Sequence, residues 1–398
     1  MKDYFIYSGA DRLKNVEMSS IRIVIEKARD MAAAGYPVIS LSAGEPDFNT
    51  PKAIKEATID ALREDMTHYS SNRGYLPLKK EIAASIKEET GTEYDPDKEI
   101  LTTNGGAEAL NNIFLSTINP RDEVIIFTPA FVSYRQLAIM CGATPVEIPL
   151  TKDDGYQIDI EAVKAAITDR TKMIVLNNPN NPTGAVYKYE KLEQLCKIAI
   201  ENNLMVLSDE IYSNIVYDGE FHSIASFPGM KERTFLVSGF SKIFAMTGWR
   251  MGYIACDSRF YANLMKVHQY STTSSVTFTQ AGLARAMRSE SVKEDTAQMV
   301  KTFAKRRNLI TALLDEIPGL SYVVPEGAFY IMIDVSATGL NGEEFAKRLL
   351  NEKYVATVPA VGLGSHCVNE IRVSFASSEE SLIEAFSRMK DFVKEILK

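Results

Sequence analysis

The chain has 398 residues, of which 45% are apolar and 24% are charged, and its formal net charge is −8. This composition is typical of a well-packed globular protein and argues against long disordered tracts. The acidic balance argues against a nucleic-acid partner and against a basic membrane-binding surface, because both need positive charge. We therefore expect no nucleic acid and no membrane among the partners.

The terminal residues and the cysteines narrow the class further. No run approaches the roughly 18 apolar residues of a membrane span. The first residues, MKDYFIYSGADRLK, lack the apolar core and cleavage site of a signal peptide, so we expect a cytoplasmic protein. The four cysteines are isolated, which predicts reduced, mostly buried thiols. The four histidines lack metal-ligand spacing, so no metal site is expected: His68, His222, His268 and His366.

Between about residue 98 and residue 256, short β-rich runs alternate with helical patterns. Seven such runs follow one another: EILTT, DEVIIFT, TPVEI, KMIVLN, LMVLSDE, TFLVS and GYIAC. Continuous apolar strands that alternate with amphipathic helices predict a mainly parallel sheet that is covered on both faces. The fold class is therefore α/β.

The C-terminal part has a different pattern. Residues 287–316 form one long helical pattern, with an apolar stripe of Met299, Phe303, Ile310 and Leu314. The runs GAFYIMIDV and IRVSFA and two further amphipathic helices follow it, which indicates a mixed α+β segment. Residues 18–41 are expected to pack with this segment. The predicted organisation is a large domain at 51–286 and a smaller, discontinuous domain made of 1–50 and 287–398.

In an open α/β sheet, ligands bind outside the carboxyl ends of the strands, so the residues just after each predicted strand are candidates for a site. After EILTT, a glycine turn leads into a helical pattern, where the N–H groups of Gly106 and Ala107 would attract a phosphate; a tight turn alone explains the glycines equally well. After DEVIIFT, Phe131 could stack on a planar ligand or belong to the core. After KMIVLN, Asn181 could offer its amide to a ligand or only stabilise a turn.

Asp209 ends the buried run LMVLS, where a carboxylate is costly unless it finds a partner. It could pair with a cation such as a protonated ring nitrogen, with Tyr212 pointing the same way, or it could cap a helix.

The stretch SGFSKIFAMTGWRMG (238–252) holds a lysine with unusual neighbours. Lys242 follows an apolar strand and would be partly desolvated, which lowers the pKa of its amine and favours the neutral, nucleophilic form. Ser238 and Ser241 add hydroxyl groups, and Arg250 adds a guanidinium suited to phosphate; a buried ion pair is the alternative for either cation. Taken together, the five strand ends describe a site for an aromatic, phosphorylated aldehyde with a basic ring nitrogen. That molecule is pyridoxal 5′-phosphate, bonded to Lys242 as a Schiff base.

Over essentially its whole length the chain resembles the class I aminotransferases of the fold type I pyridoxal-phosphate superfamily. The stretch GFSKIFAMTGWRMG fits the lysine signature of that family at every position. AGEPDF, HYSSNRGYLPLK, NNPNNPTG, SDEIY and IRVSFA are similar to family blocks and occur in the family order. The resemblance is greatest to the prokaryotic branch that contains aspartate and aromatic aminotransferases. It implies a large domain on a mainly parallel seven-stranded sheet and a smaller α+β domain.

The resemblance also implies roles for the candidate residues. Lys242 would carry the cofactor and then move the proton between the substrate Cα and the cofactor, while Asp209 would keep the ring nitrogen protonated. Tyr212 and Asn181 would hydrogen-bond the phenolic oxygen, and Phe131 would stack on the ring. The phosphate would be held by the amides of Gly106 and Ala107, by Ser238 or Ser241, by Arg250, and by Tyr69 from a partner subunit, which implies a homodimer.

Substrate recognition follows from the same resemblance. Arg372, with help from Asn181 and the Gly44 backbone, would clamp the α-carboxylate; an exposed arginine on a strand is the alternative. Aspartate-selective members of the branch place a lysine just after the glycine pair, where this chain has Ala107. Arg22 could still reach a side-chain carboxylate. We therefore expect broad specificity, with aromatic amino acids at least as favoured as aspartate, and 2-oxoglutarate as acceptor in a ping-pong reaction.

Three other functions would use the same groups. A pyridoxal-phosphate lyase of the cysteine-S-conjugate β-lyase type would release pyruvate and ammonia without an amino acceptor. A decarboxylating condensing enzyme is a further alternative, although no feature of the sequence asks for it. A non-catalytic ligand-binding regulator on the same fold is the third. The presence together of Lys242, Asp209 and Arg372 argues against such a regulator.

Overall fold

The computed structural model describes residues 9–398. Its largest sheet has seven strands in the order β2-β8-β7-β6-β5-β3-β4. Only β8 runs against the others, antiparallel to both β2 and β7. The mainly parallel seven-stranded sheet and the α/β class expected from the sequence are therefore confirmed. The strands are β2 (Ile100–Thr103), β3 (Glu123–Thr128), β4 (Thr144–Pro149), β5 (Thr171–Asn177), β6 (Met205–Asp209), β7 (Thr234–Gly239) and β8 (Gly252–Ala255).

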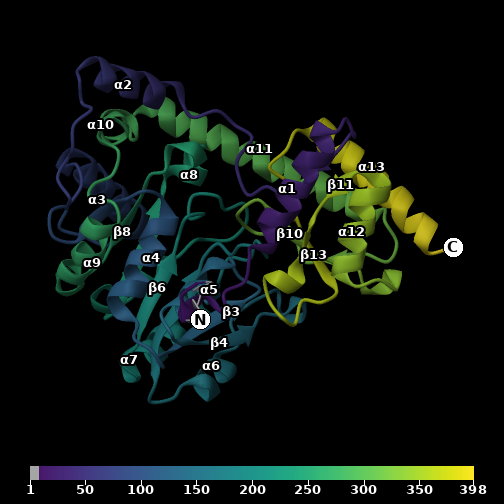
Figure 1. Ribbon diagram of the computed structural model, residues 1–398, viewed down its shortest axis with the longest axis horizontal. Helices are drawn as coiled ribbons and strands as arrows, with labels where there is room; N and C mark the ends of the chain where they lie inside the picture. The colour runs from purple at the N-terminus through teal and green to yellow at the C-terminus, as the bar shows by residue number, and fades with distance from the viewer. Residues whose placement is uncertain (1–8) are drawn as a thin grey trace, which may run out of the picture.

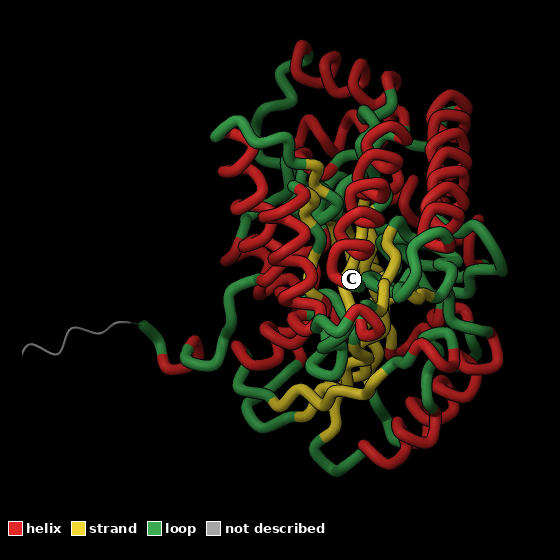
Figure 2. Tube along the Cα trace, turned by 90° about the vertical axis from the view of Figure 1, so that its right-hand side faces the viewer, coloured by secondary structure: helices red, strands yellow, loops and turns green. Residues whose placement is uncertain are grey.

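Helices cover both faces of this sheet, and in Figure 2 they lie on either side of the strands. Apolar side chains of α4, α5 and α9 pack on one face, and those of α3, α6, α7, α8 and α10 pack on the other. Because both faces are covered, every residue of β3 is buried, as its continuous apolar run predicted. The helices of this part are α2 (Lys52–Arg63), α3 (Leu76–Thr90), α4 (Gly106–Thr117), α5 (Ser133–Met140), α6 (Ile160–Ala166), α7 (Tyr189–Glu201), α8 (Phe240–Ile243), α9 (Ser258–Ser271) and α10 (Thr277–Ala286).

The remaining elements form a second, smaller assembly, which lies on the right of Figure 1. A four-stranded antiparallel sheet has the order β12-β13-β10-β9, and the long helix α11 runs from the large sheet toward it. The elements are α1 (Ser20–Ala33), β1 (Ile39–Ser40), α11 (Glu290–Asp315), β9 (Ser321–Tyr322), β10 (Tyr330–Asp334), α12 (Gly342–Lys353), β11 (Val355–Ala356), β12 (Val358–Pro359), β13 (Glu370–Ser374) and α13 (Glu379–Ile396).

The N-terminal segment packs with this smaller assembly. Strand β1 pairs in parallel with β11, so residues near 40 hydrogen-bond to residues near 355. The apolar stripe expected on the long helix lies in the core of the same assembly. The domain boundaries at residues 50 and 286 stay a prediction, and residues 1–8 of that assignment lie outside the described part of the chain.

Two further expectations concern the whole chain. The cysteines are all free, and three of the four are buried: Cys196, Cys256 and Cys367. Among residues 9–398, no helix is both long enough and apolar enough to cross a membrane.

Candidate active site

A pocket of about 540 Å³ lies where the carboxyl ends of the large sheet meet the smaller assembly. This volume is in the usual range for a site that encloses a small molecule. The lining comes from both parts of the chain, because β6, α4 and α8 contribute on one side and α1, β10 and β13 on the other. All predicted site residues except Ser238 and Tyr69 line it: Arg22, Gly44, Gly106, Ala107, Phe131, Asn181, Asp209, Tyr212, Ser241, Lys242, Arg250 and Arg372.

Lys242 reaches the pocket from α8, the short helix that follows β7. Its amine donates a hydrogen bond to the carbonyl oxygen of Gly44 and lies 6.0 Å from the centroid of the Phe329 ring. The pKa of Lys242 is lowered to about 8, mainly by burial. The guanidinium groups of Arg372 and Arg250 also lower it, and the carboxylates of Glu45 and Asp209 oppose them. A substantial fraction of the amine is therefore neutral near physiological pH, as a nucleophile requires.

Asp209 is the last residue of β6, and its side chain is buried at the floor of the pocket. One carboxylate oxygen accepts a hydrogen bond from the Tyr134 hydroxyl at 2.7 Å, and the other accepts one from the Ile211 N–H at 3.2 Å. Burial raises the pKa of Asp209 above its usual value, and these two donors only partly offset that effect. Within residues 9–398, no basic side chain forms an ion pair with it, so the carboxylate is suited to a ligand that brings its own positive charge.

Arg372 enters the pocket from β13 and is only 1% exposed. Its guanidinium donates hydrogen bonds to Asn181 Oδ1 at 3.2 Å and to the Ser42 carbonyl at 2.8 Å, and it lies 4.6 Å from the centroid of the Tyr330 ring. Its Nε has no partner in the described chain, and no carboxylate of residues 9–398 pairs with it. A buried guanidinium without a carboxylate is costly, which is typical of a group that binds an anionic ligand.

The glycine turn after β2 lies against the second arginine of the pocket. Gly105 precedes α4 with φ of 81°, a left-handed conformation that favours glycine. A Cβ atom at Gly105 would lie 2.6 Å from Arg250 Nη2, so only glycine lets the guanidinium come this close. The free amides at the start of α4 and the Arg250 charge therefore converge on one point of the pocket, as an anion such as phosphate requires.

The two candidate serines lie in different places. Ser241 lines the pocket, whereas the Ser238 hydroxyl donates to the Glu210 carbonyl at 3.4 Å and does not reach the lining. Side chains alternate between the two faces of the sheet along β7. Ser238 therefore points to the same face as Leu236, which packs under α8 and α10. Tyr69, which was expected to act on a partner subunit, is 86% exposed and lies outside this pocket.

Three site residues were not found from the sequence. Tyr134 hydrogen-bonds Asp209, Tyr330 pairs with the Tyr212 hydroxyl at 2.9 Å, and Asn177 accepts the Asn181 N–H at 2.8 Å. Tyr134 is the last residue of the run PAFVSY that follows β3, so its position after a predicted strand could have identified it as a candidate. Tyr330 carried no such signal, because its place beside Arg372 depends on the pairing of β10 with β13.

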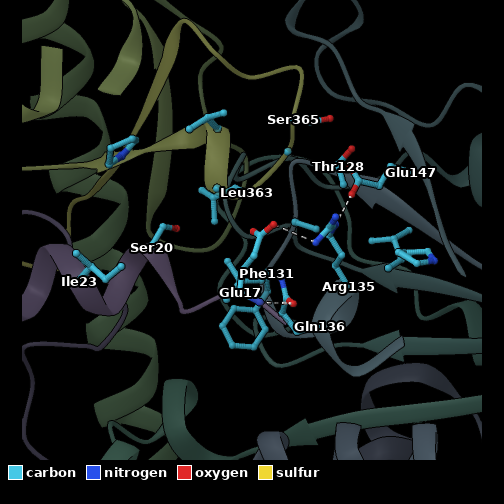
Figure 3. A pocket seen from close by; sticks show the side chains of 18 of the residues that line it. Glu17, Ser20, Ile23, Thr128, Phe131, Arg135, Gln136, Glu147, Leu363 and Ser365 are labelled. Carbon is cyan, nitrogen blue, oxygen red and sulfur yellow. Dashed lines mark hydrogen bonds and ion pairs between the residues drawn. The ribbon is translucent and has the colours of Figure 1, made fainter. Parts of the chain in front are cut away.

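A second cavity of about 750 Å³ lies beside the site and shares Phe131 and Val132 with it. Figure 3 shows Arg135 between two carboxylates there: its Nε donates to Glu147 at 3.0 Å, and its Nη1 lies 3.7 Å from Glu17. Glu17 precedes α1, and its N–H also donates to a side chain of α5. Because its only arginine is already neutralised, this cavity is a poorer place for an anionic ligand than the first pocket.

Comparison with known proteins decides the family. A model of the aminotransferases of class I and II matches residues 36–389. The chain belongs to this family. It is 41% identical to an aspartate aminotransferase of Pyrococcus abyssi over 387 residues, which cover 97% of this chain and 98% of the relative. It is 39% identical, with the same coverage, to aromatic-amino-acid aminotransferase 2 of Thermococcus litoralis. The resemblance stated from the sequence is confirmed, and the protein is an aminotransferase.

Solved structures agree with this assignment. An aspartate aminotransferase of Thermus thermophilus, solved with maleate, superimposes on this aminotransferase with a TM-score of 0.93 at 36% identity and covers 97% of this chain. All of that chain is covered in turn. An aromatic aminotransferase of Pyrococcus horikoshii gives a TM-score of 0.89 at 40% identity, with 92% of this chain and 99% of that chain covered.

Proposed function

We propose that this aminotransferase binds pyridoxal 5′-phosphate in the first pocket, with Lys242 as its covalent attachment point. The observation that carries the proposal is that a lysine with a lowered pKa and a fully buried arginine without a carboxylate partner line the same pocket. The other groups fit the cofactor one by one. Asp209 suits a protonated ring nitrogen, Phe131 suits a stacked ring, and the glycine turn with Arg250 suits a phosphate.

When bound, pyridoxal phosphate accepts the electrons that remain when a proton leaves the amino acid Cα. Lys242 supplies the base for that step, because its amine lies among the pocket residues and its lowered pKa keeps a neutral fraction available. Asp209 holds a proton on the ring nitrogen by charge, and Tyr134 keeps that carboxylate in place. Tyr212 and Asn181 line the same pocket and are proposed to hydrogen-bond the phenolic oxygen.

We propose that Arg372 binds the α-carboxylate of the amino acid. Asn181 and the Ser42 carbonyl fix the orientation of its guanidinium, and the Tyr330 ring stacks beneath it. A planar guanidinium held in this way can make two parallel hydrogen bonds to a carboxylate. The Gly44 backbone, which lines the same pocket, stays a candidate to help through its N–H, because its carbonyl accepts from Lys242.

The donor side chain is proposed to be apolar, aromatic or acidic, with 2-oxoglutarate as the acceptor in a ping-pong reaction. Ile21, Ile25 and Leu110 give the pocket an apolar wall, and Arg22 is exposed at its rim. Ala107 occupies the place after the glycine pair and adds no charge. The names of the relatives, which include both aspartate and aromatic aminotransferases, support this range.

We further propose a cytoplasmic homodimer in which Tyr69 of each subunit contacts the phosphate of the other. The exposure of Tyr69 supports this arrangement, because a tyrosine with 86% of its surface free is available to a partner. Sedimentation of the protein checks it, since an active, stable monomer would contradict a shared site.

Single-turnover spectroscopy tests the proposed function. The purified protein is loaded with pyridoxal phosphate, and one amino acid at a time is added without an oxo acid. We expect the visible band of the lysine-bound cofactor to fade, with about one 2-oxo acid released per subunit. A band that persists while pyruvate and ammonia accumulate would show a lyase instead. Phenylalanine, tyrosine, aspartate and glutamate rank the donors, and reaction of the two acidic amino acids alone would contradict the broad range.

A further inference from the structure

A buried, hydrogen-bonded pair of side chains lies next to the turn that is proposed to hold the phosphate. Glu108, in the first turn of α4, meets His268 of α9, with 2.6 Å between Glu108 Oε1 and His268 Nδ1. The two side chains are only 10% and 1% exposed. The carboxylate accepts only, so the His268 ring donates this hydrogen bond. Neither residue faces the pocket, and neither has a part in the reaction described above.

Glu108 acts on the backbone of the glycine turn. Its second oxygen accepts the N–H of Asn104 at 2.6 Å, which links the residue just after β2 to the first turn of α4. Gly105 stands at the helix N-cap and has no side chain to do this. The Glu108 carboxylate therefore sets the direction in which the amides of Gly106 and Ala107 point.

His268 keeps the Glu108 carboxylate ionised and aligned. Burial by itself would raise the pKa of Glu108, but the hydrogen bonds from His268, from the Asn104 N–H and from Asn112 outweigh it and hold the pKa below its usual value. The bond from His268 is the only one that comes from a different helix, since α9 packs against α4. It therefore ties the turn to a rigid neighbour 160 residues away in the chain.

We propose that His268 is a positioning residue that acts through Glu108 to aim the backbone amides of the Gly105–Ala107 turn at the cofactor phosphate. This inference rests on the proposed function, because it assumes that the turn binds that phosphate. It gives a specific expectation. Loss of the His268 hydrogen bond weakens binding of ligands that carry the phosphate and leaves binding of the same ring without phosphate unchanged.

The experiment compares pyridoxal 5′-phosphate with pyridoxal, which lacks the phosphate. Dissociation constants of both are measured on cofactor-free protein from the visible band and from quenching of Trp249, the neighbour of Arg250 and the only tryptophan. In His268→Leu we expect pyridoxal phosphate to bind about tenfold more weakly, as one lost charge-assisted hydrogen bond implies, with pyridoxal unchanged. His268→Asn keeps an N–H donor and should recover most of the loss. His222→Leu, at a position that does not line the pocket, is the control for removal of a histidine.

The outcomes separate the two proposals. If His268→Leu binds both ligands more weakly to the same extent, or binds neither more weakly, the positioning role is overturned. If the native protein itself binds pyridoxal phosphate no better than pyridoxal, the phosphate site fails and the proposed function fails with it. Where His268→Leu does not fold, Glu108→Gln keeps the side-chain volume, removes the charge, and must show the same selective loss.

Discussion

Replacing Arg372 should lower the activity and leave the stability nearly unchanged, because burial of its charged guanidinium costs folding free energy. Its guanidinium is 1% exposed and has no carboxylate partner within residues 9–398, so an apolar residue of similar length, as in Arg372→Met, relieves a desolvation penalty. The change also leaves Asn181 Oδ1 and the Ser42 carbonyl without their donor, at about 1–3 kcal/mol each. These effects oppose one another, and we expect a melting temperature within about 3 °C of native or above it.

The effect on activity should be large. Two charge-assisted hydrogen bonds to the substrate carboxylate contribute roughly 1.5–3 kcal/mol each, so kcat/KM for amino acids should fall by about 10²- to 10⁴-fold. Steady-state kinetics and calorimetry on one preparation measure both quantities. Arg348→Met is the matched control, because that arginine lies outside the pocket, pairs with Glu352 on the same helix and should keep native kcat/KM. A kcat/KM for Arg372→Met within about tenfold of native, or a loss that merely follows unfolding, would refute the reasoning.

Three further outcomes are expected. The neutral amine of Lys242 attaches the cofactor, and the pKa of this amine lies at about 8. The rate of attachment, measured by stopped-flow growth of the visible band, should therefore rise roughly tenfold between about pH 6 and pH 7 and level off above pH 8. A rate that does not change with pH would contradict this expectation. Burial raises the pKa of Glu210 to about 8. The protonated side chain therefore contributes its whole stabilising free energy below 4.5, the pKa in the unfolded chain, and this contribution is lost as the pH rises through 8. Glu210→Gln should therefore lose less unfolding free energy than the native protein between about pH 5 and pH 8 in urea titrations, and equal losses would exclude the effect. A Cβ atom at Gly282 of α10 would lie only 1.9 Å from Thr58 Oγ1 of α2. Gly282→Ala should therefore cost about 1–3 kcal/mol of unfolding free energy in the same titrations, while kcat per folded molecule stays native. An unchanged unfolding free energy would show that the two helices separate freely.

The large sheet could be predicted because its signals are local. Its central strands β3 and β5 to β7 are rich in apolar residues and almost wholly buried, and such a strand is recognised without knowledge of its partners. A buried carboxylate at the end of such a run, as at Asp209, is costly without a partner, which made it a candidate for a ligand site. The direction of β8 could not be read in this way, since an apolar run looks the same in either orientation.

The site residues that escaped prediction depend on contacts between distant parts of the chain. Tyr330 stands beside Arg372 only because β10 pairs with β13, and the Ser42 carbonyl meets the guanidinium across 330 residues of sequence. The Glu108–His268 pair likewise joins two helices that only the packing on one face of the sheet brings together. Ser238 was a candidate equal to Ser241 in the sequence. The structure separates them because Ser238 lies within β7 and does not reach the pocket, whereas Ser241 lies on α8 and lines it.

Reduction of the loaded protein with borohydride, followed by peptide mass spectrometry, tests the central claim most directly. Within residues 9–398, burial lowers the pKa of two lysines to about 8: Lys242, which faces the pocket, and Lys79 of α3, which is buried and donates to the Tyr261 hydroxyl. A lowered pKa alone would favour both. The structure predicts a reduced cofactor adduct on Lys242, at about one per subunit, and none on Lys79. An adduct on Lys79, or a cofactor that leaves no adduct on Lys242, would contradict the assignment of the active site.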